Sequence, residues 1–239
     1  MTVRLFVDAP LERDAEIELP ASAARHVQVR RLQPADRLLL FNGQGGEWAA
    51  TVVRMGRSQV WVRVVSFDPV ERELPVHVTL AVGMPANERM DLLVEKATEL
   101  GVQGIQPLLC ERSVLRLAGD RALRKREHWQ AIAAAAAEQC GRTRVPRVAP
   151  VLLFERWLHL LDEPSTRVLL SPRADLPALR DVAGAAATLL TLSGPEGGLS
   201  AAEESAALAK VFVAARLGDR VLRAETAPLA VLAWIGLKE

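Results

Sequence analysis

The sequence has 239 residues, of which 50% are hydrophobic and 25% are charged, and its formal net charge is +1 at pH 7. This balance is typical of a globular protein and excludes a disordered chain, which combines low hydrophobicity with high net charge. Two cysteines are too few for a disulfide framework, and no apolar run reaches the roughly 20 residues of a membrane span. Because the N-terminus also lacks the pattern of a secretory signal, we expect a cytoplasmic protein.

The first 70 residues predict a small β domain. Alternating apolar residues favour strands at 3–7, 16–19, 37–41, 47–54 and 59–67. The glycine-rich segment Asn42–Gly46 predicts a hairpin turn, because glycine readily adopts positive φ. Ser22 is expected to cap a short helix that runs through His26 to Arg30. Since short strands leave few exposed edges once a sheet closes, we predict a barrel or sandwich.

The charged, proline-bracketed segment 68–75 is predicted to be a linker, and the pattern changes after it. Helices are expected at Asn87–Leu100 and at 120–139. Strands are expected at 76–82, 104–109, 167–170, 188–192 and 211–215, and a helical segment follows each of the last three. Such alternation favours an open, mostly parallel sheet with helices on both faces. We therefore predict two domains, residues 1–72 and residues 73–239.

Three loops that follow strands of this sheet are candidates for chemistry, because parallel sheets bind ligands where their strands end. They contain residues 169–173, 192–200 and 217–228. The second loop holds Gly194, Gly197 and Gly198, which let main-chain groups approach a ligand, although a tight turn without a ligand fits as well. Ser200 and Glu203 predict a capping box at the start of the next helix.

The third loop places Val221 and Leu222 inside a charged run. These two side chains could line an apolar slot for a flat ring, or they could tether the loop to the core. Thr226 could act as a helix cap. A metal site is not expected, because the four histidines show no ligand spacing and the HExxH motif is absent.

Positive charge is concentrated in one stretch, residues 111–147, which holds nine basic and four acidic residues. A solvated helix face with a basic loop would show this pattern, and so would a nucleic-acid contact surface. The net charge of the whole chain, +1, is too small to indicate a nucleic-acid binder by itself.

Motifs in a characteristic order connect these loops to a known family. They are Arg25–Arg31, Asp36-Arg37, Phe41–Gly43, Glu95–Val102, Glu111–Ser113, Glu138–Arg142, Val145-Pro146, Gly194–Gly198, Leu217-Gly218, Leu222-Arg223 and Glu225–Ala227. With them the chain resembles the RsmE family of ribosomal RNA uridine-N3 methyltransferases, within the SPOUT superfamily of knotted methyltransferases. Three positions depart from the family's usual residues, namely Ser193, Leu199 and Ala224.

The resemblance implies the overall architecture and the partners. It implies a small PUA-like RNA-binding β-barrel over residues 1–72 and an α/β SPOUT domain with a trefoil knot over residues 73–239. It also implies a homodimer that acts on 16S ribosomal RNA within the small ribosomal subunit. The methyl donor would be S-adenosylmethionine, held by Leu170, Ser193, Gly194, Glu196, Gly197, Leu217, Val221, Leu222 and Thr226.

The chemistry of methylating uracil N3 suggests which residues are catalytic, and positive charge suggests which bind RNA. The nitrogen must lose its proton while negative charge spreads to O2 and O4. We expect Arg223 or Arg142 to face these oxygens and Glu225 to position or remove the proton, because arginine stabilises anions and a carboxylate can act as a base. A salt bridge that organises the loop is the alternative role for Arg223 and Glu225. The expected phosphate contacts are Arg4, Arg25, Arg30, Arg31, Arg112 and Arg144.

Three other functions stay open at this stage. A SPOUT methyltransferase could act on another RNA, for instance on transfer-RNA ribose. A non-catalytic RNA-binding ribosome assembly factor could retain the same fold. A phosphate-loop nucleotide enzyme would share the glycine-rich turn, but the lysine and the spacing of that motif are absent.

Overall fold

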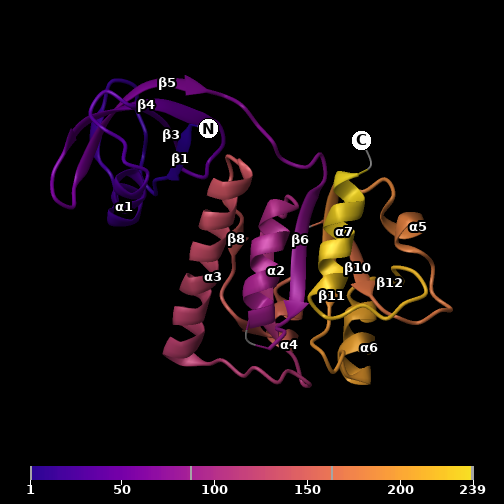
Figure 1. The fold of residues 1–239 in the computed structure, drawn as a ribbon. Coiled ribbons are helices and arrows are strands. Elements are labelled where there is room, and N and C mark those ends of the chain that lie inside the picture. The colour runs from indigo at the N-terminus through magenta and orange to yellow at the C-terminus, as the bar shows by residue number, and fades with distance from the viewer. Residues whose placement is uncertain (1, 87, 163, 238–239) are drawn as a thin grey trace. The chain divides into compact units, whose positions relative to one another are not determined.

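The computed structural model describes residues 2–86, 88–162 and 164–237 (Figure 1). It contains two compact units. One comprises the chain up to Glu73 together with Ala134–Val145, and the other comprises Leu74–Ala133 and the chain from Pro146 onward. The division of the chain into domains at residues 72 and 73 stays a prediction, and the structure adds that Ala134–Val145 packs with the first unit.

A five-stranded sheet forms the first unit. Its order is β1-β3-β4-β5-β2, and the strands are β1 (Val3–Phe6), β2 (Glu16–Glu18), β3 (Arg37–Phe41), β4 (Glu47–Met55) and β5 (Val60–Asp68). The β1–β3 pair is parallel and the other pairs are antiparallel. The alternation of β5 places Val60, Val62 and Val64 in a core that excludes water. The expected β domain is confirmed.

Helix α1 (Ala21–Val29) crosses this unit, but its start differs from the prediction. The N-cap residue is Pro20, which makes no side-chain cap hydrogen bond. Ser22 lies inside the helix, so its predicted capping role is wrong. Proline is compatible with a helix start because its fixed φ is already close to the helical value.

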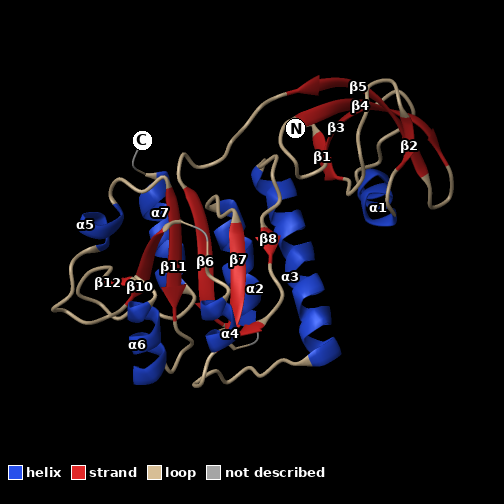
Figure 2. Ribbon diagram, turned by 180° about the vertical axis from the view of Figure 1, so that it is seen from behind, coloured by secondary structure: helices blue, strands red, loops and turns tan. Residues whose placement is uncertain are grey.

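A parallel sheet of seven strands forms the second unit (Figure 2). Its path runs β12-β10-β11-β6-β7-β8, and β9 also pairs with β7. All of its strand pairs within the described residues are parallel, as predicted. The strands are β6 (His77–Gly83), β7 (Gly104–Leu109), β8 (Arg147–Val148), β9 (Leu152–Leu153), β10 (Thr166–Leu170), β11 (Thr188–Ser193) and β12 (Val213–Ala215).

In the described part of the chain, six helices accompany this sheet: α2 (Glu88–Glu99), α3 (Gly119–Cys140), α4 (Phe154–His159), α5 (Leu179–Ala183), α6 (Ala201–Ala209) and α7 (Thr226–Gly236). Figures 1 and 2 show α2 and α7 side by side on one face, and α7 contacts β6 and β11. On the other face, Leu190 and Leu192 pack in a cluster with α4 and α6. The predicted start of α2 at Asn87 lies outside the described residues.

The two predicted helix caps of this unit had different outcomes. The capping box is confirmed, because Ser200 Oγ accepts from the Glu203 amide at 3.3 Å and Glu203 Oε2 accepts from the Ser200 amide at 2.9 Å. The capping role of Thr226 is wrong, because α7 begins at Thr226 with Glu225 in the N-cap position. The trefoil knot stays a prediction.

Two further properties bear on the expectations from composition. Both cysteines are free thiols. Burial raises the pKa of the Cys110 thiol to about 12, so this thiol stays protonated at neutral pH. Within the described ranges, none of the helices is long and apolar enough to span a bilayer.

Candidate functional site

The three predicted loops meet at one edge of the second unit's sheet. β12, β10 and β11 are neighbours and run parallel, so their carboxyl ends lie together. The loops after them line a cavity of about 440 Å³, which is within the roughly 300–1,000 Å³ that small-molecule sites occupy. Position at the carboxyl edge and size both fit a ligand site.

Most of the residues predicted to hold a cofactor line this cavity. They are Leu170, Ser193, Gly194, Glu196, Leu217, Val221 and Leu222, and Arg223 joins them from the predicted catalytic set. Gly197 and Thr226 are not among the lining residues. That these particular residues hold the cofactor stays a prediction, but the structure brings them from three separate loops to one place.

The glycine-rich loop after β11 is tightly folded. A Cβ at Gly194 would lie 2.7 Å from the Leu199 nitrogen, so only glycine fits there without a shift of the backbone. The Gly198 amide donates to the Pro195 carbonyl at 2.8 Å. Arg112 donates from Nη1 to the carbonyls of Gly197 at 3.1 Å and Leu199 at 3.3 Å. These contacts give the cavity a fixed main-chain wall.

Two glutamates fasten this loop and its helix to neighbouring segments. Glu196 Oε1 accepts from the Ala86 amide at 2.9 Å and from Arg89 Nη1 at 3.3 Å. Glu203 Oε1 accepts from the Glu111 amide at 2.9 Å. The segments that follow β6 and β7 therefore hold the loop in position.

Apolar side chains form a second part of the lining. Leu169 and Leu199 are buried, whereas Leu170, Leu217 and Leu222 are only partly covered. Val221 is 81% exposed. This exposure contradicts the alternative that Val221 tethers its loop to the core. The arrangement suits the face of a flat ring, since burying apolar surface against leucines is favourable.

Three buried oxygen atoms have no hydrogen-bond partner in the described part of the chain. They are Thr191 Oγ1, Ser193 Oγ and Glu225 Oε2. Because a buried polar atom without a partner is costly, such atoms call for a water or a ligand. Ser193 is among the residues that line the cavity, but its hydroxyl oxygen is itself buried. Glu225 is buried at the start of α7, and its neighbours Ala224 and Ala227, but not Glu225 itself, line the cavity.

Comparison with known proteins decides the family. A model described as an RNA methyltransferase domain matches residues 72–236, and one described as an RNA methyltransferase PUA domain matches residues 19–65. Ribosomal RNA small subunit methyltransferase E of Bacillus subtilis is 33% identical to this chain over 216 residues, which cover 87% of this chain and 84% of the relative. The chain belongs to the ribosomal RNA small subunit methyltransferase E family.

Solved structures agree with this membership. Ribosomal RNA small subunit methyltransferase E from Neisseria gonorrhoeae, bound to S-adenosyl methionine, superposes with a TM-score of 0.91 at 31% identity and covers 98% of this chain and 97% of its own. A putative methyltransferase from Legionella pneumophila, in complex with the cofactor SAM, has a TM-score of 0.92 at 32% identity, with the same coverage. The PUA and SPOUT fold assignments are therefore confirmed.

For a member of this family, the two arginines predicted to be catalytic lie in very different surroundings. Arg223 is exposed and lines the cavity. Arg142 belongs to the first unit, is 4% exposed, and is paired with Glu73 through Nε, at 3.1 Å, and Nη2. The structure does not place Arg142 among the residues that line the cavity.

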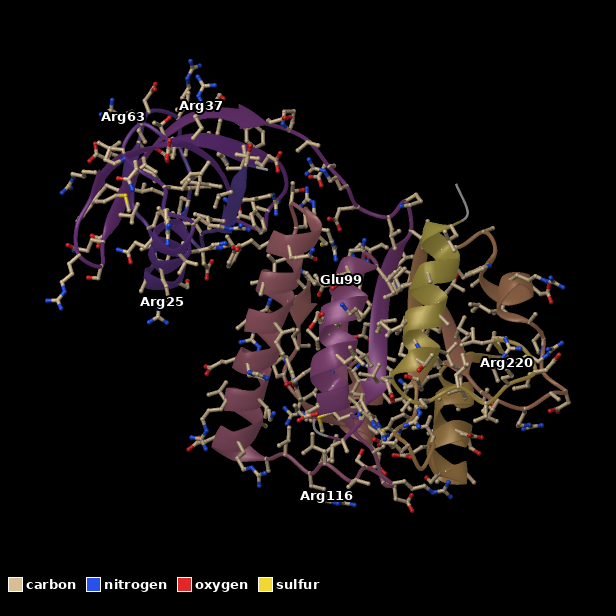
Figure 3. All side chains as sticks on the ribbon, in the orientation of Figure 1. Arg25, Arg37, Arg63, Glu99, Arg116 and Arg220 are labelled. Carbon is tan, nitrogen blue, oxygen red and sulfur yellow. The ribbon has the colours of Figure 1, made fainter. Side chains whose placement is uncertain are left out.

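The arginines predicted to bind RNA also fall into two groups. Arg25, Arg30 and Arg31 are exposed on or just after α1, and Figure 3 shows Arg25 pointing outward. Arg144 is exposed but pairs with Glu71 at 2.7 Å. Arg4 is only 11% exposed and donates to Glu47 at 3.1 Å. Its guanidinium lies over the ring of Phe41, and burial lowers its pKa. Arg112 holds the glycine-rich loop.

Three charged residues of the cavity were missed from the sequence: Arg89, Glu204 and Arg220. Arg89 lies in the first turn of α2, where the predicted pattern only marked an amphipathic helix. Glu204 follows the capping-box residue Glu203, and Arg220 lies inside the third predicted loop, but neither was assigned a role. No local signal identifies Arg89, because its approach to the cavity depends on how distant segments pack. No group of three or more histidine, cysteine or acidic residues among the described positions could hold a metal ion.

Proposed function

We propose that this protein transfers a methyl group from S-adenosylmethionine to N3 of a uridine in 16S ribosomal RNA. The observation that carries the proposal is the convergence of the three loops on a single cavity, in a chain of the methyltransferase E family. Two solved relatives at 31% and 32% identity are described with this cofactor bound.

The lining of the cavity fits the cofactor. Leu170, Leu217 and Leu222 offer apolar surface for the adenine ring, and the glycine-rich main chain offers polar contacts. Gly194, Glu196 and Val221 complete the predicted residues at the cavity, whereas Gly197 and Thr226 stay assigned by the family resemblance alone. When bound, S-adenosylmethionine would supply an electrophilic methyl group on its sulfonium.

The residues of the chain would then prepare the uracil. Arg223 is the arginine assigned to the uracil oxygens, because it is exposed at the cavity while the guanidinium of Arg142 is buried against Glu73. A permanently charged guanidinium stabilises the anion left when N3 loses its proton. Glu225 is assigned to hold or accept that proton, and its unpartnered Oε2 is consistent with a role beyond packing.

The first unit is assigned to RNA recognition, with residues 1–72 as the PUA-like domain and Arg25, Arg30 and Arg31 as its exposed phosphate contacts. The substrate is the 16S RNA within the small ribosomal subunit, recognised largely by shape, which would place the reaction in the cytoplasm. We assign a homodimer as the active form, in which the partner chain would complete the active site.

The test is methyl transfer to small ribosomal subunits that lack the modification. Purified protein and labelled S-adenosylmethionine are incubated with these subunits, with naked 16S RNA, and with transfer RNA, and the products are identified by nucleoside mass spectrometry. We expect N3-methyluridine at one position, in subunits more than in naked RNA. Subunits that already carry the modification are the control and should accept no label.

The other outcomes separate the alternative functions. Label in transfer RNA alone would show a methyltransferase with a different substrate. Absence of transfer together with absence of S-adenosylmethionine binding in calorimetry would favour a non-catalytic RNA-binding assembly factor. Either result would overturn the proposed reaction.

A further inference from the structure

Arg89 lines the cavity although helix α2 gives no reason for an arginine there. It lies in the first turn of α2, and its side chain is 42% exposed. A positive charge at a helix N-terminus opposes the helix dipole, which favours negative charge at that end. Helix stability therefore does not explain Arg89, and its place at the cavity suggests a contact with a ligand.

An opposite charge lies beside Arg89. Arg89 Nη1 donates to Glu196 Oε1 at 3.3 Å, and the same oxygen accepts from the Ala86 amide at 2.9 Å. Among the described residues, no partner bonds to Nε or Nη2 of Arg89 or to Oε2 of Glu196. The wall of the cavity thus presents free donors and a free acceptor side by side.

The backbone under this pair is closely packed. A Cβ at Gly83 would lie 2.4 Å from Pro195 Cδ, so the end of β6 and the glycine-rich loop touch directly. The amide of Arg89 donates to the Ala86 carbonyl at 3.3 Å. Close packing of this kind fixes the backbone from which the two side chains project, so less entropy is lost when they bind a ligand.

The charge pattern selects the kind of ligand. A phosphate would meet the Glu196 carboxylate as well as Arg89, and like charges repel. An α-amino acid carries a carboxylate and an ammonium group next to each other, which complements a guanidinium beside a carboxylate. Arginine also binds carboxylates through two parallel hydrogen bonds.

We propose that Arg89 and Glu196 bind the amino-acid end of S-adenosylmethionine, Arg89 through the carboxylate and Glu196 through the ammonium group. The inference rests on the proposed function, since it names the residues that recognise one part of that cofactor. The exposed ion pair between Arg89 and Glu196 is weak by itself, so its groups can turn to the ligand at small cost.

Calorimetry with two ligands tests this assignment. S-adenosylmethionine has the amino-acid end, whereas 5′-methylthioadenosine lacks it and keeps the adenosine part. In Arg89→Ala we expect the Kd of S-adenosylmethionine to rise about 10- to 100-fold, the usual effect of removing a hydrogen bond to a charged group. The Kd of 5′-methylthioadenosine should not change. Arg89→Lys should recover part of the loss, because it keeps the charge without the planar fork.

Glu88→Ala is the matched control, since Glu88 is an exposed charged residue of the same helical turn that does not line the cavity. It should leave both affinities unchanged. Equal weakening of both ligands by Arg89→Ala would show that Arg89 only supports the loop through Glu196, and would overturn the proposal. Unchanged cofactor affinity with a raised KM for RNA would also overturn it, in favour of a phosphate contact.

The wild-type protein separates this inference from the proposed function. If it binds S-adenosylmethionine and methylates small subunits while Arg89→Ala behaves like wild type, only the assignment of Arg89 fails. If the wild-type protein binds neither ligand, the proposed function fails and the assignment fails with it.

Discussion

Two arginines of the first unit, Arg4 and Arg142, and two at the cavity of the second unit, Arg89 and Arg223, have opposite surroundings. In the first unit, Arg142 is buried and bonded to Glu73, and Arg4, 11% exposed, is bonded to Glu47. At the cavity, Arg223 is exposed, and only one nitrogen of Arg89 has a partner among the described residues.

This difference shows that the burial of the side chain and its hydrogen-bond partners distinguish a structural arginine from a ligand-binding one, since the residue type is the same. A buried guanidinium needs its carboxylate, because an isolated charge in the interior is strongly unfavourable. Its donors are then committed and cannot serve a substrate. An exposed guanidinium contributes little to stability and keeps its donors for a ligand.

The largest expected effect is on stability in the first unit. Arg142→Ala leaves the Glu73 side chain, which is only 14% exposed, without its partner, so the free energy of unfolding should fall by about 3 kcal/mol, the lower end of the range for a buried pair. Urea denaturation of the full chain measures this change. A variant as stable as wild type that has lost turnover would contradict the structural role and return Arg142 to the catalytic candidates.

The paired replacement sharpens the same comparison. Arg142→Met combined with Glu73→Leu removes both charges and should recover much of the lost stability, since apolar residues of similar volume often replace a buried ion pair without loss. Arg13→Ala, at an exposed position of the same unit, is the control and should change stability little.

The next effect is on turnover at the cavity. Arg223→Ala should lower kcat about 10²- to 10³-fold, because it removes a donor to a developing anion. Glu225→Gln should lower kcat by a similar factor, because it removes the proton acceptor. Single-turnover methyl transfer measures the rate, and calorimetry should show nearly unchanged affinity for S-adenosylmethionine. Unchanged turnover would remove that residue from the catalytic set. Arg180→Ala, exposed on α5, is the control.

The smallest effect concerns RNA affinity. Arg25→Ala, Arg30→Ala and Arg31→Ala should each reduce the slope of log K against log salt concentration by roughly one, because each exposed arginine releases about one counterion from RNA. Filter binding at several salt concentrations measures the slope. Arg144→Ala should change the slope less, since Arg144 is already paired with Glu71. An equal change for all four would remove the distinction between paired and unpaired arginines.

Several parts of the fold could be predicted because their signals are local. The alternation of β5 and the Ser200–Glu203 capping box are visible in short windows of sequence, and both are confirmed. β8 and β9 were missed because two residues cannot show a period. Ser22 and Thr226 are suitable capping residues in isolation, but α1 begins after Pro20 and α7 begins at Thr226 itself.

The sequence by itself determined the two kinds of fold, the three loops and the family, because periodicity, glycine spacing and motif order are properties of neighbouring residues. Only the tertiary structure decided which arginines are committed to the interior and which line the cavity. Arg142 meets Glu73 across 69 positions, and Arg89 meets Glu196 across 107. Such pairs form when packing brings distant segments together, and the burial that fixes their roles does not exist until the chain has folded.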